Sequence, residues 1–253
     1  MYKEIRIFFT ALMFYTRIPC PKWVDHDPIY MKESARYFSL IGWIVGAISA
    51  GTFWLTSQFL PTNIAIILSM IVSIRATGAF HEDGLADVAD GFGGGWTKDK
   101  ILEIMKDSRL GTFGVTALIC ILGLKFTSLA EMPKNTIPLA ILMGNVLSRT
   151  IASRMLYRGD YVQNNNLAKA GSAADKLSIT SLVVNILFGG LTFLLFMNAY
   201  LLLIIPILIL LEYLMYRFYK KWIGGYNGDC AGAVQQISEV VIYMMLLILW
   251  KLF

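Results

Sequence analysis

The sequence of 253 residues is poor in charge and in cysteine, and each shortage excludes a class of protein. Charged residues make up 15% of the chain and hydrophobic residues 57%, whereas water-soluble domains carry about 25% charged and 45–50% apolar residues. The three cysteines, Cys20, Cys120 and Cys230, are odd in number and far apart. They form neither a disulfide framework nor a zinc-binding pattern. The composition therefore predicts a polytopic membrane protein.

Apolar stretches close to the ~20 residues that a membrane-crossing helix needs recur along the chain. They predict an all-α helical bundle, a single membrane domain over residues 1–253. An interfacial helix is expected at 1–19, because Ile5, Phe8 and Leu12 recur at helical spacing. Seven spans are expected, with a turn near Asn198 dividing the longest stretch: 39–60, 64–80, 111–129, 136–154, 177–197, 200–217 and 237–253. Glu212, within the sixth span, has no assigned role.

The net charge of +5 has a topological explanation. With seven spans, all of the 22 Lys and Arg residues fall on one side of the membrane except Lys125, Lys134 and Lys251. The positive-inside rule makes that side cytoplasmic. We therefore expect the lipid bilayer, and not nucleic acid, as a partner. The expected location is the cell membrane, or the inner membrane of a host with two, and a homo-oligomer stays compatible with the sequence.

The most informative segment follows the second span and contains Glu82, Asp83, Asp87 and Asp90. On a helix the three aspartates fall within about 60° of arc, and neighbours three and four apart have Cβ atoms about 6 Å from each other. Like charges this close repel one another, and a hard divalent cation such as Mg²⁺ removes the conflict. Bound Mg²⁺ also clamps the oxygens of a phosphoryl transfer. The alternative is a solvated acidic cap at a helix end.

Other segments on the same side suit a phosphate-rich substrate. Lys106 and Arg109 lie in a basic loop before the third span, although each is also explained as a topological charge alone. Asp229 follows the sequence Gly-Gly-Tyr-Asn-Gly that begins at Gly224. It is either a further metal or substrate ligand or the N-cap of the last helix after an Asn-Gly turn.

Several motifs together resemble cobalamin-5′-phosphate synthase, also called adenosylcobinamide-GDP ribazoletransferase. The resemblance rests on segments spread over essentially the whole chain: Thr16-Arg-Ile-Pro19, His81-Glu-Asp-Gly-Leu-Ala-Asp-Val-Ala-Asp-Gly91, Met105-Lys-Asp-Ser-Arg-Leu-Gly-Thr-Phe-Gly114 and Gly225-Tyr-Asn-Gly-Asp-Cys-Ala-Gly-Ala233. It implies a Mg²⁺-dependent membrane transferase of the last stage of vitamin B12 synthesis. That family joins adenosylcobinamide-GDP to α-ribazole or α-ribazole 5′-phosphate and releases GMP.

The resemblance also implies roles for individual residues. Asp83, Asp87 and Asp90 are expected as metal ligands, with Glu82 as a ligand or base and Asp229 as the catalytic candidate from a second segment. The candidates for phosphate or substrate binding are Lys106, Arg109, Arg17 and Asn227. No single residue is assigned as the general base, and the number of metal ions stays open.

Two other functions compete with this interpretation. A CDP-alcohol phosphotransferase of phospholipid synthesis also carries Asp-x-x-Asp-Gly on a membrane helix, but here Gly91 is followed by Phe-Gly-Gly-Gly-Trp instead of that family's continuation. An ion-coupled transporter uses acidic residues within the membrane. The acids of this chain gather at one interface, and no inverted repeat is visible, which argues against a transporter.

Overall fold

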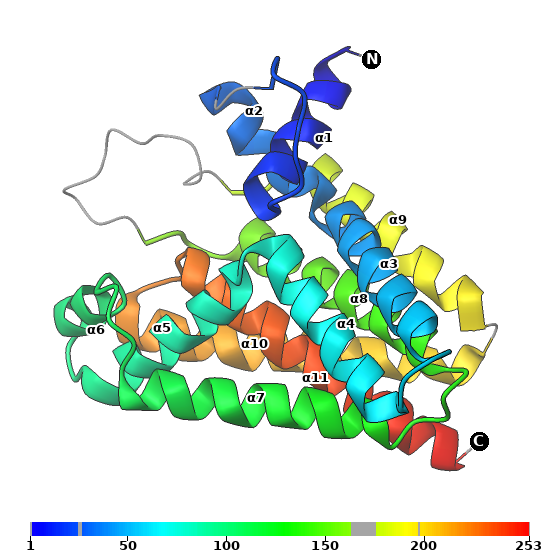
Figure 1. Cartoon of the computed structure of the whole chain (residues 1–253). Coiled ribbons are helices and arrows are strands. Elements are labelled where there is room, and N and C mark those ends of the chain that lie inside the picture. Colours follow the sequence, from blue (N-terminus) through cyan, green and yellow to red (C-terminus); the bar gives the residue numbers. More distant parts are fainter. Residues whose placement is uncertain (1, 25–26, 163–175, 197, 253) are drawn as a thin grey trace.

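The computed structural model describes residues 2–24, 27–162, 176–196 and 198–252, and its regular elements are helices (Figure 1). In chain order they are α1 (Tyr2–Tyr15), α2 (Pro28–Glu33), η1 (Ser34–Tyr37), α3 (Phe38–Thr56), α4 (Thr62–Thr77), α5 (Phe80–Gly94), α6 (Lys98–Ile104), α7 (Thr112–Ala130), α8 (Ile137–Arg158), α9 (Ile179–Phe196), η2 (Ala199–Leu203), α10 (Ile204–Ile223) and α11 (Gly228–Leu252). The described ranges contain no strand, only one isolated bridge between Tyr161 and Tyr226. The all-α prediction is therefore confirmed. The predicted boundaries at 1, 197 and 253 lie outside the described residues.

The membrane character of the chain is visible in its apolar helices. Four helical segments of the described chain are long and apolar enough to cross a membrane: Pro28–Thr56, Thr112–Ala130, Ala199–Ile223 and Gly228–Trp250. A fifth results if the bent pair α4 and α5 counts as one span, and Ile179–Leu195 is apolar but shorter. The predicted membrane bundle is supported, while the number of seven spans stays a prediction.

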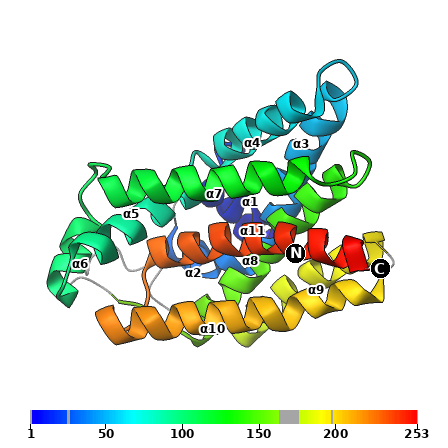
Figure 2. The same cartoon turned by 90° about the horizontal axis from the view of Figure 1, so that it is seen from below.

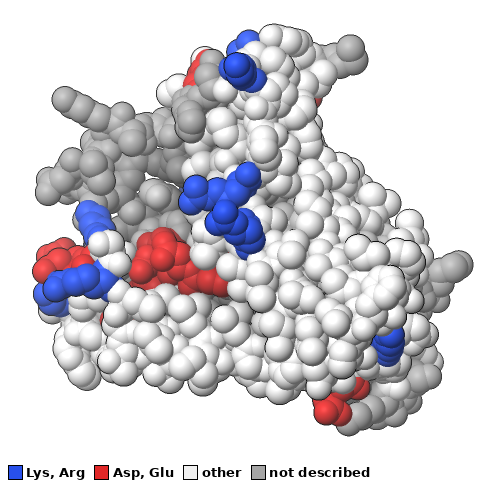
Figure 3. Space-filling model, viewed as in Figure 1, with Lys and Arg blue, Asp and Glu red and all other residues white. Residues whose placement is uncertain are grey.

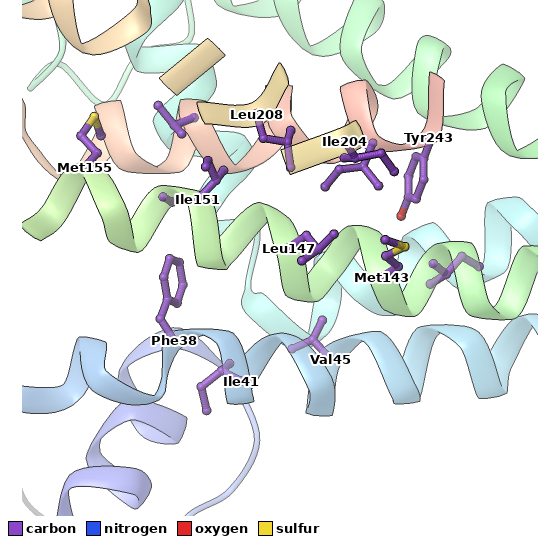
Figure 4. Close-up of a cluster of buried hydrophobic side chains, with 14 of the residues drawn as sticks. Phe38, Ile41, Val45, Met143, Leu147, Ile151, Met155, Ile204, Leu208 and Tyr243 are labelled. Atoms are coloured by element: carbon purple, nitrogen blue, oxygen red, sulfur yellow. The ribbon is translucent and has the colours of Figure 1, made fainter. Parts of the chain in front are cut away.

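Helix α8 lies at the centre of the bundle, between α3 on one side and α10 and α11 on the other (Figure 4). Buried apolar side chains fill the space between these helices. From α3 they are Phe38, Ile41 and Val45, from α8 Met143, Leu147, Ile151 and Met155, from α10 Ile204 and Leu208, and from α11 Tyr243. Figure 2, in which the molecule is seen from below, shows α7, α11 and α10 side by side.

A buried group of ion pairs connects α10 to α8. It contains Glu212, the acidic residue within the sixth predicted span. The Glu212 side chain is fully buried, and its Oε2 lies 3.1 Å from Nε of Arg154. Its Oε1 lies 3.4 Å from Nε of Arg158, one turn further along α8. Removing one partner of such a group leaves a buried charge uncompensated. Glu212 therefore has a structural role between two helices.

The chain turns sharply between α4 and α5, where the two helix axes differ by 87°. Gly78 and Ala79 both adopt left-handed backbone angles, with φ of 68° and 61°. This conformation is uncommon for a residue with a side chain, so Ala79 marks a conformation that the surrounding packing imposes. The bend sends α5 across the bundle, where it packs against α7 and α11.

The N-terminal helix exists as predicted, but its buried face differs from the one that the sequence pattern indicates. Ile7 and Ala11 are fully buried, whereas Ile5, which the pattern placed on the apolar face, is 41% exposed. Helix α1 packs against α2 and η1, and Arg36 of η1 holds its Glu4 with a contact of 2.6 Å. These contacts fix the entry of the chain to one end of α3 (Figure 1).

Candidate functional site

Helix α5 carries all four acids of the predicted site, but they do not share one environment. Asp83 is exposed and Asp87 is half-buried, while Glu82 and Asp90 are buried. Figure 3 shows acidic side chains gathered on one face of the molecule, with basic side chains on either side of them. The local helix therefore divides the acidic motif between solvent and protein interior.

Asp229 reaches this motif because α5 and α11 approach each other at backbone distance. A Cβ atom at Gly84 would lie only 2.9 Å from Cα of Asp229, so any larger residue at position 84 would push the helices apart. The Asp87 carboxylate lies within electrostatic range of Asp229, of Asp83 and of Asp90. We call Asp83, Asp87 and Asp229 the aspartate cluster.

Asn227 orients the third member of the cluster. Its Oδ1 accepts a hydrogen bond from the backbone N–H of Cys230 at 3.0 Å, which caps the start of α11. Its Nδ2 donates to Oδ2 of Asp229 at 2.9 Å. The N-cap of α11 is therefore Asn227 and not Asp229, so the structural alternative that the sequence left open for Asp229 is wrong. The predicted substrate contact of Asn227 stays a prediction.

The aspartate cluster lacks a compensating cation within the described part of the chain. Ion pairs there involve other acids, such as Asp107, Asp160, Glu212 and Glu239. No three Asp, Glu, His or Cys side chains in these ranges converge closely enough to hold a metal ion by themselves. Mg²⁺ needs no such cage, because one or two carboxylates, waters and substrate phosphates usually complete its coordination. The cluster's oxygens fit that manner of binding.

Asp90 has a different partner from the other aspartates. Its Oδ2 accepts from the backbone N–H of Gly111 at 2.7 Å, and its Oδ1 accepts from Gly114 at 2.9 Å. Both donors are unpaired backbone groups at the start of α7, where a negative charge also favours the helix dipole. Asp90 thus anchors α7 to α5. Each oxygen of Asp90 keeps one lone pair that these hydrogen bonds do not use. If Asp90 binds a metal ion as predicted, it does so through these lone pairs.

Glu82 faces the protein interior and not the aspartate cluster. Its Oε1 accepts from Nε2 of Gln236 at 2.9 Å, and its Oε2 is buried without a partner among the described residues. Beside it, Nζ of Lys125 lies 3.0 Å from Oε2 of Glu239. The structure therefore places the Glu82 carboxylate against Gln236, and its predicted role as a metal ligand or base stays a prediction.

Lys125, Gln236 and Glu239 form a buried polar network that sequence reasoning did not connect to the acidic motif. Tyr243 donates to Oε1 of Glu239 at 2.8 Å, and Gln235 donates to its Oε2 at 3.1 Å. The available signal was the presence of charged residues within apolar spans, which usually face a protein interior. Their mutual pairing follows only from the packing of α5, α7 and α11.

The predicted phosphate-binding residues lie at two separate places. Arg17 crosses the α4–α5 bend: its backbone N–H donates to the carbonyl of Ala76 at 2.7 Å, and its side chain packs over Gly78. Lys106 and Arg109 are exposed near α6. The Arg109 guanidinium is paired with Asp107, and its hydrogen bonds lower the pKa of that carboxyl to about 2. Only Arg17 adjoins the start of α5.

The chain is similar to known proteins over nearly its whole length. A family model described as cobalamin-5-phosphate synthase matches residues 7–247, which include the aspartate cluster. A relative from Shewanella oneidensis named adenosylcobinamide-GDP ribazoletransferase is 42% identical over 250 residues, 98% of this chain and 95% of its own. Relatives of the same name from Shewanella halifaxensis and Shewanella frigidimarina are also 42% identical over 250 residues, covering 98% and 97% of this chain and 96% and 95% of theirs. No solved structure matches. The chain belongs to the cobalamin-5-phosphate synthase family.

Proposed function

We propose that this protein is a Mg²⁺-dependent transferase that joins adenosylcobinamide-GDP to α-ribazole, or to α-ribazole 5′-phosphate, and releases GMP. The family match and the names of the relatives support the reaction. The observation that carries the site is the approach of Asp229 on α11 to Asp83 and Asp87 on α5, without a cation partner among the described residues. Such a group of carboxylates suits a metal-assisted phosphoryl transfer.

The chemistry requires one phosphorus–oxygen bond to form and one to break. A ribazole hydroxyl oxygen attacks the phosphorus attached to the cobinamide arm, the diphosphate bridge breaks, and its bridging oxygen leaves with GMP. Mg²⁺ bound at the cluster would neutralise charge on the diphosphate. A carboxylate of the cluster takes the proton of the attacking hydroxyl, which is a role that general-base catalysis assigns to a positioned side chain.

The positions of the residues favour different roles for the aspartates of the cluster and for Arg17. Exposed Asp83 and half-buried Asp87 lie four residues apart on α5 and so share a face of the helix; in this proposal they serve as ligands to the metal ion. Asp229 is oriented by Asn227, and Arg17 contributes positive charge near the start of α5. In this arrangement a bound diphosphate lies between the aspartate cluster and Arg17 at the α4–α5 bend.

The proposal is tested with purified protein, adenosylcobinamide-GDP and Mg²⁺, with GMP release and corrinoid product followed together. We expect GMP release on addition of α-ribazole or its 5′-phosphate, and the ratio of the two rates identifies the natural acceptor. Removal of Mg²⁺ with a chelator should stop release, and added Mg²⁺ should restore it. Absence of GMP release with either acceptor contradicts the proposal, and a lipid product from a CDP-activated donor would assign the phospholipid reaction instead.

We also propose that the aspartate cluster faces the cytoplasm, because the side that carries it holds most of the basic residues. The exposed Ser108, between α6 and α7, and Gln58, after α3, are expected on opposite sides. In a background without native cysteines, Ser108→Cys should react with a membrane-impermeant maleimide only in inverted vesicles. Gln58→Cys should react only in right-side-out vesicles. The reverse pattern contradicts this orientation.

A further inference from the structure

A cavity of about 160 Å³ adjoins the aspartate cluster and takes no part in the chemistry described so far. Its wall is rich in aromatic rings from five separate parts of the chain: Phe14, Tyr15, Phe38, Phe80, Tyr161 and Tyr226. Tyr15 stacks on Phe38 with ring centroids 4.5 Å apart, and Tyr161 meets Tyr226 edge to face at 5.5 Å. Because Phe14 and Phe80 are partly exposed, the cavity communicates with the surface.

The cavity and the cluster share the same two helices. Phe80 lies one turn before Asp83 on the same face of α5, since residues three apart are neighbours on a helix. Gly228 and Ala231, on either side of Asp229 in the first turn of α11, line the cavity. A ligand in the cavity therefore extends toward the cluster within about one helical turn, roughly 5 Å.

One polar group in the wall lacks a partner. His81 lines the cavity, and its ring stacks on Phe38 with centroids 5.7 Å apart. The His81 side chain is buried, and its Nε2 has no hydrogen-bond partner among the described residues. A buried polar atom without a partner is costly, and an imidazole nitrogen either donates or accepts according to its tautomer. A bound heterocycle whose ring nitrogen reaches Nε2 would satisfy it.

We propose that this cavity, which we call the aromatic cavity, binds the base of the ribazole nucleoside and directs its ribose to the aspartate cluster; this rests on the proposed function. The base is a dimethylated benzimidazole, a flat and largely apolar bicycle with one free ring nitrogen. Flat rings gain from stacking and edge-to-face contacts with aromatic side chains, and His81 offers one polar partner. A cavity of ~150 Å³ in another protein takes up a benzene ring.

The other parts of the two substrates fit this cavity poorly. The corrin ring is many times larger than a benzimidazole, so it exceeds a cavity of about 160 Å³. Guanine carries donors and acceptors along two edges, and these need several polar partners when they are buried. The wall consists mainly of aromatic, aliphatic and small residues, and Lys32, Ser34 and His81 are its other polar side chains besides the tyrosines. The guanosine diphosphate portion is therefore assigned to the exposed side of the cluster.

The test fills the cavity and measures each substrate separately. Ala231→Leu adds three carbons to the wall, and since a single surplus methylene can cost 10-fold or more, the KM for ribazole should rise by at least about 10-fold. The KM for adenosylcobinamide-GDP should not change. Ala199→Leu makes the same substitution at an exposed position at the start of η2 and should change neither constant.

Two further measurements sharpen the test, and the first of them, made in His81→Phe, keeps the proposal falsifiable if Ala231→Leu folds poorly. His81→Phe keeps a ring but removes Nε2, so it should raise the KM for ribazole alone. Second, the nucleoside of unmethylated benzimidazole should lose less affinity than ribazole in the Ala231→Leu variant, because its base is smaller. Unchanged ribazole KM in both variants, or a rise confined to adenosylcobinamide-GDP, overturns the assignment.

Calorimetric titration of the wild-type protein with ribazole alone separates this assignment from the proposed reaction. Ribazole binding that Ala231→Leu weakens supports the aromatic cavity even if GMP release is absent, in which case only the reaction fails. GMP release by the wild type together with unaltered ribazole binding in Ala231→Leu overturns the cavity and leaves the reaction intact.

Discussion

Glu82 and Asp83 are neighbours in the sequence, yet their carboxylates meet opposite surroundings. Asp83 is exposed and belongs to a cluster with no cation partner in the described ranges. Glu82 is buried and bonded to Gln236, next to the ion pair of Lys125 and Glu239. The same helix thus presents one acidic face to the molecular surface and another to the bundle interior. Acidic residues that are paired inside a protein support structure, whereas unpaired ones at a surface are available for a metal ion or a proton.

The largest effect on activity is expected from a substitution in the aspartate cluster. Asp87→Asn removes one cluster charge while keeping the shape of the side chain, so Mg²⁺-dependent GMP release should fall by about 1000-fold, the upper range for losing one electrostatic contact in a transition state. Because like charges repel, the melting temperature should stay equal or rise. Glu103→Gln, an exposed acid on α6, is the control and should keep normal activity. Near-normal turnover of Asp87→Asn would exclude this residue from the site.

Substitutions in the buried network around Lys125 and Glu239 should change the free energy of unfolding more than the turnover. Lys125→Met removes the ion-pair partner of buried Glu239 and leaves Arg149 as the other buried cation close to it, which should cost at most about 3–5 kcal/mol of unfolding free energy. Thermal or denaturant unfolding in detergent measures it. Adding Glu239→Gln to the variant removes the carboxylate charge and should recover part of the loss. A Mg²⁺ affinity that falls in the single variant, at unchanged stability, would contradict the division between the two faces.

Asp90 lies between the exposed and the buried acids of α5. A substitution there separates two roles of its carboxylate, anchoring α7 and binding a metal ion. Asp90→Asn loses one of the two acceptors for the N–H groups of Gly111 and Gly114, which should cost about 1–3 kcal/mol of stability. The Mg²⁺ concentration for half-maximal GMP release should not change. A weaker Mg²⁺ response with unchanged unfolding would instead support the ligand role that the sequence predicts.

The smallest effect is expected at Asn227, which both caps α11 and orients Asp229. Asn227→Ala should lose about 1 kcal/mol of stability, as is usual for a missing N-cap, together with part of the turnover. Asn227→Ser keeps a capping oxygen and adds no charge, but it loses the Nδ2 donor to Asp229. It should therefore keep the stability and lose turnover, as unfolding and GMP release would show. Equal turnover in Asn227→Ser and the wild type would mean that Asp229 needs no orientation.

Much of the architecture was predictable because apolar length and charge placement are local properties. The long helices lie close to the predicted spans, for example α7 at Thr112–Ala130 against 111–129. The acidic motif was found because four acids so close together conflict with burial unless something compensates them. The 87° bend at Gly78–Ala79 was not predictable, because the left-handed conformation of Ala79 depends on packing and not on its own preference.

By itself the sequence determined the helical membrane character, the acidic motif and the family, since these follow from composition, spacing and matched residues. Only the tertiary structure decided which acids lie together. Helical periodicity grouped Asp90 with Asp83 and Asp87, but the start of α7 engages it. Asp229 is distant in the sequence and joins the cluster because Gly84 leaves room for the α11 backbone. A carboxylate's role depends on the groups that surround it, and these come from helices whose mutual packing no local pattern encodes.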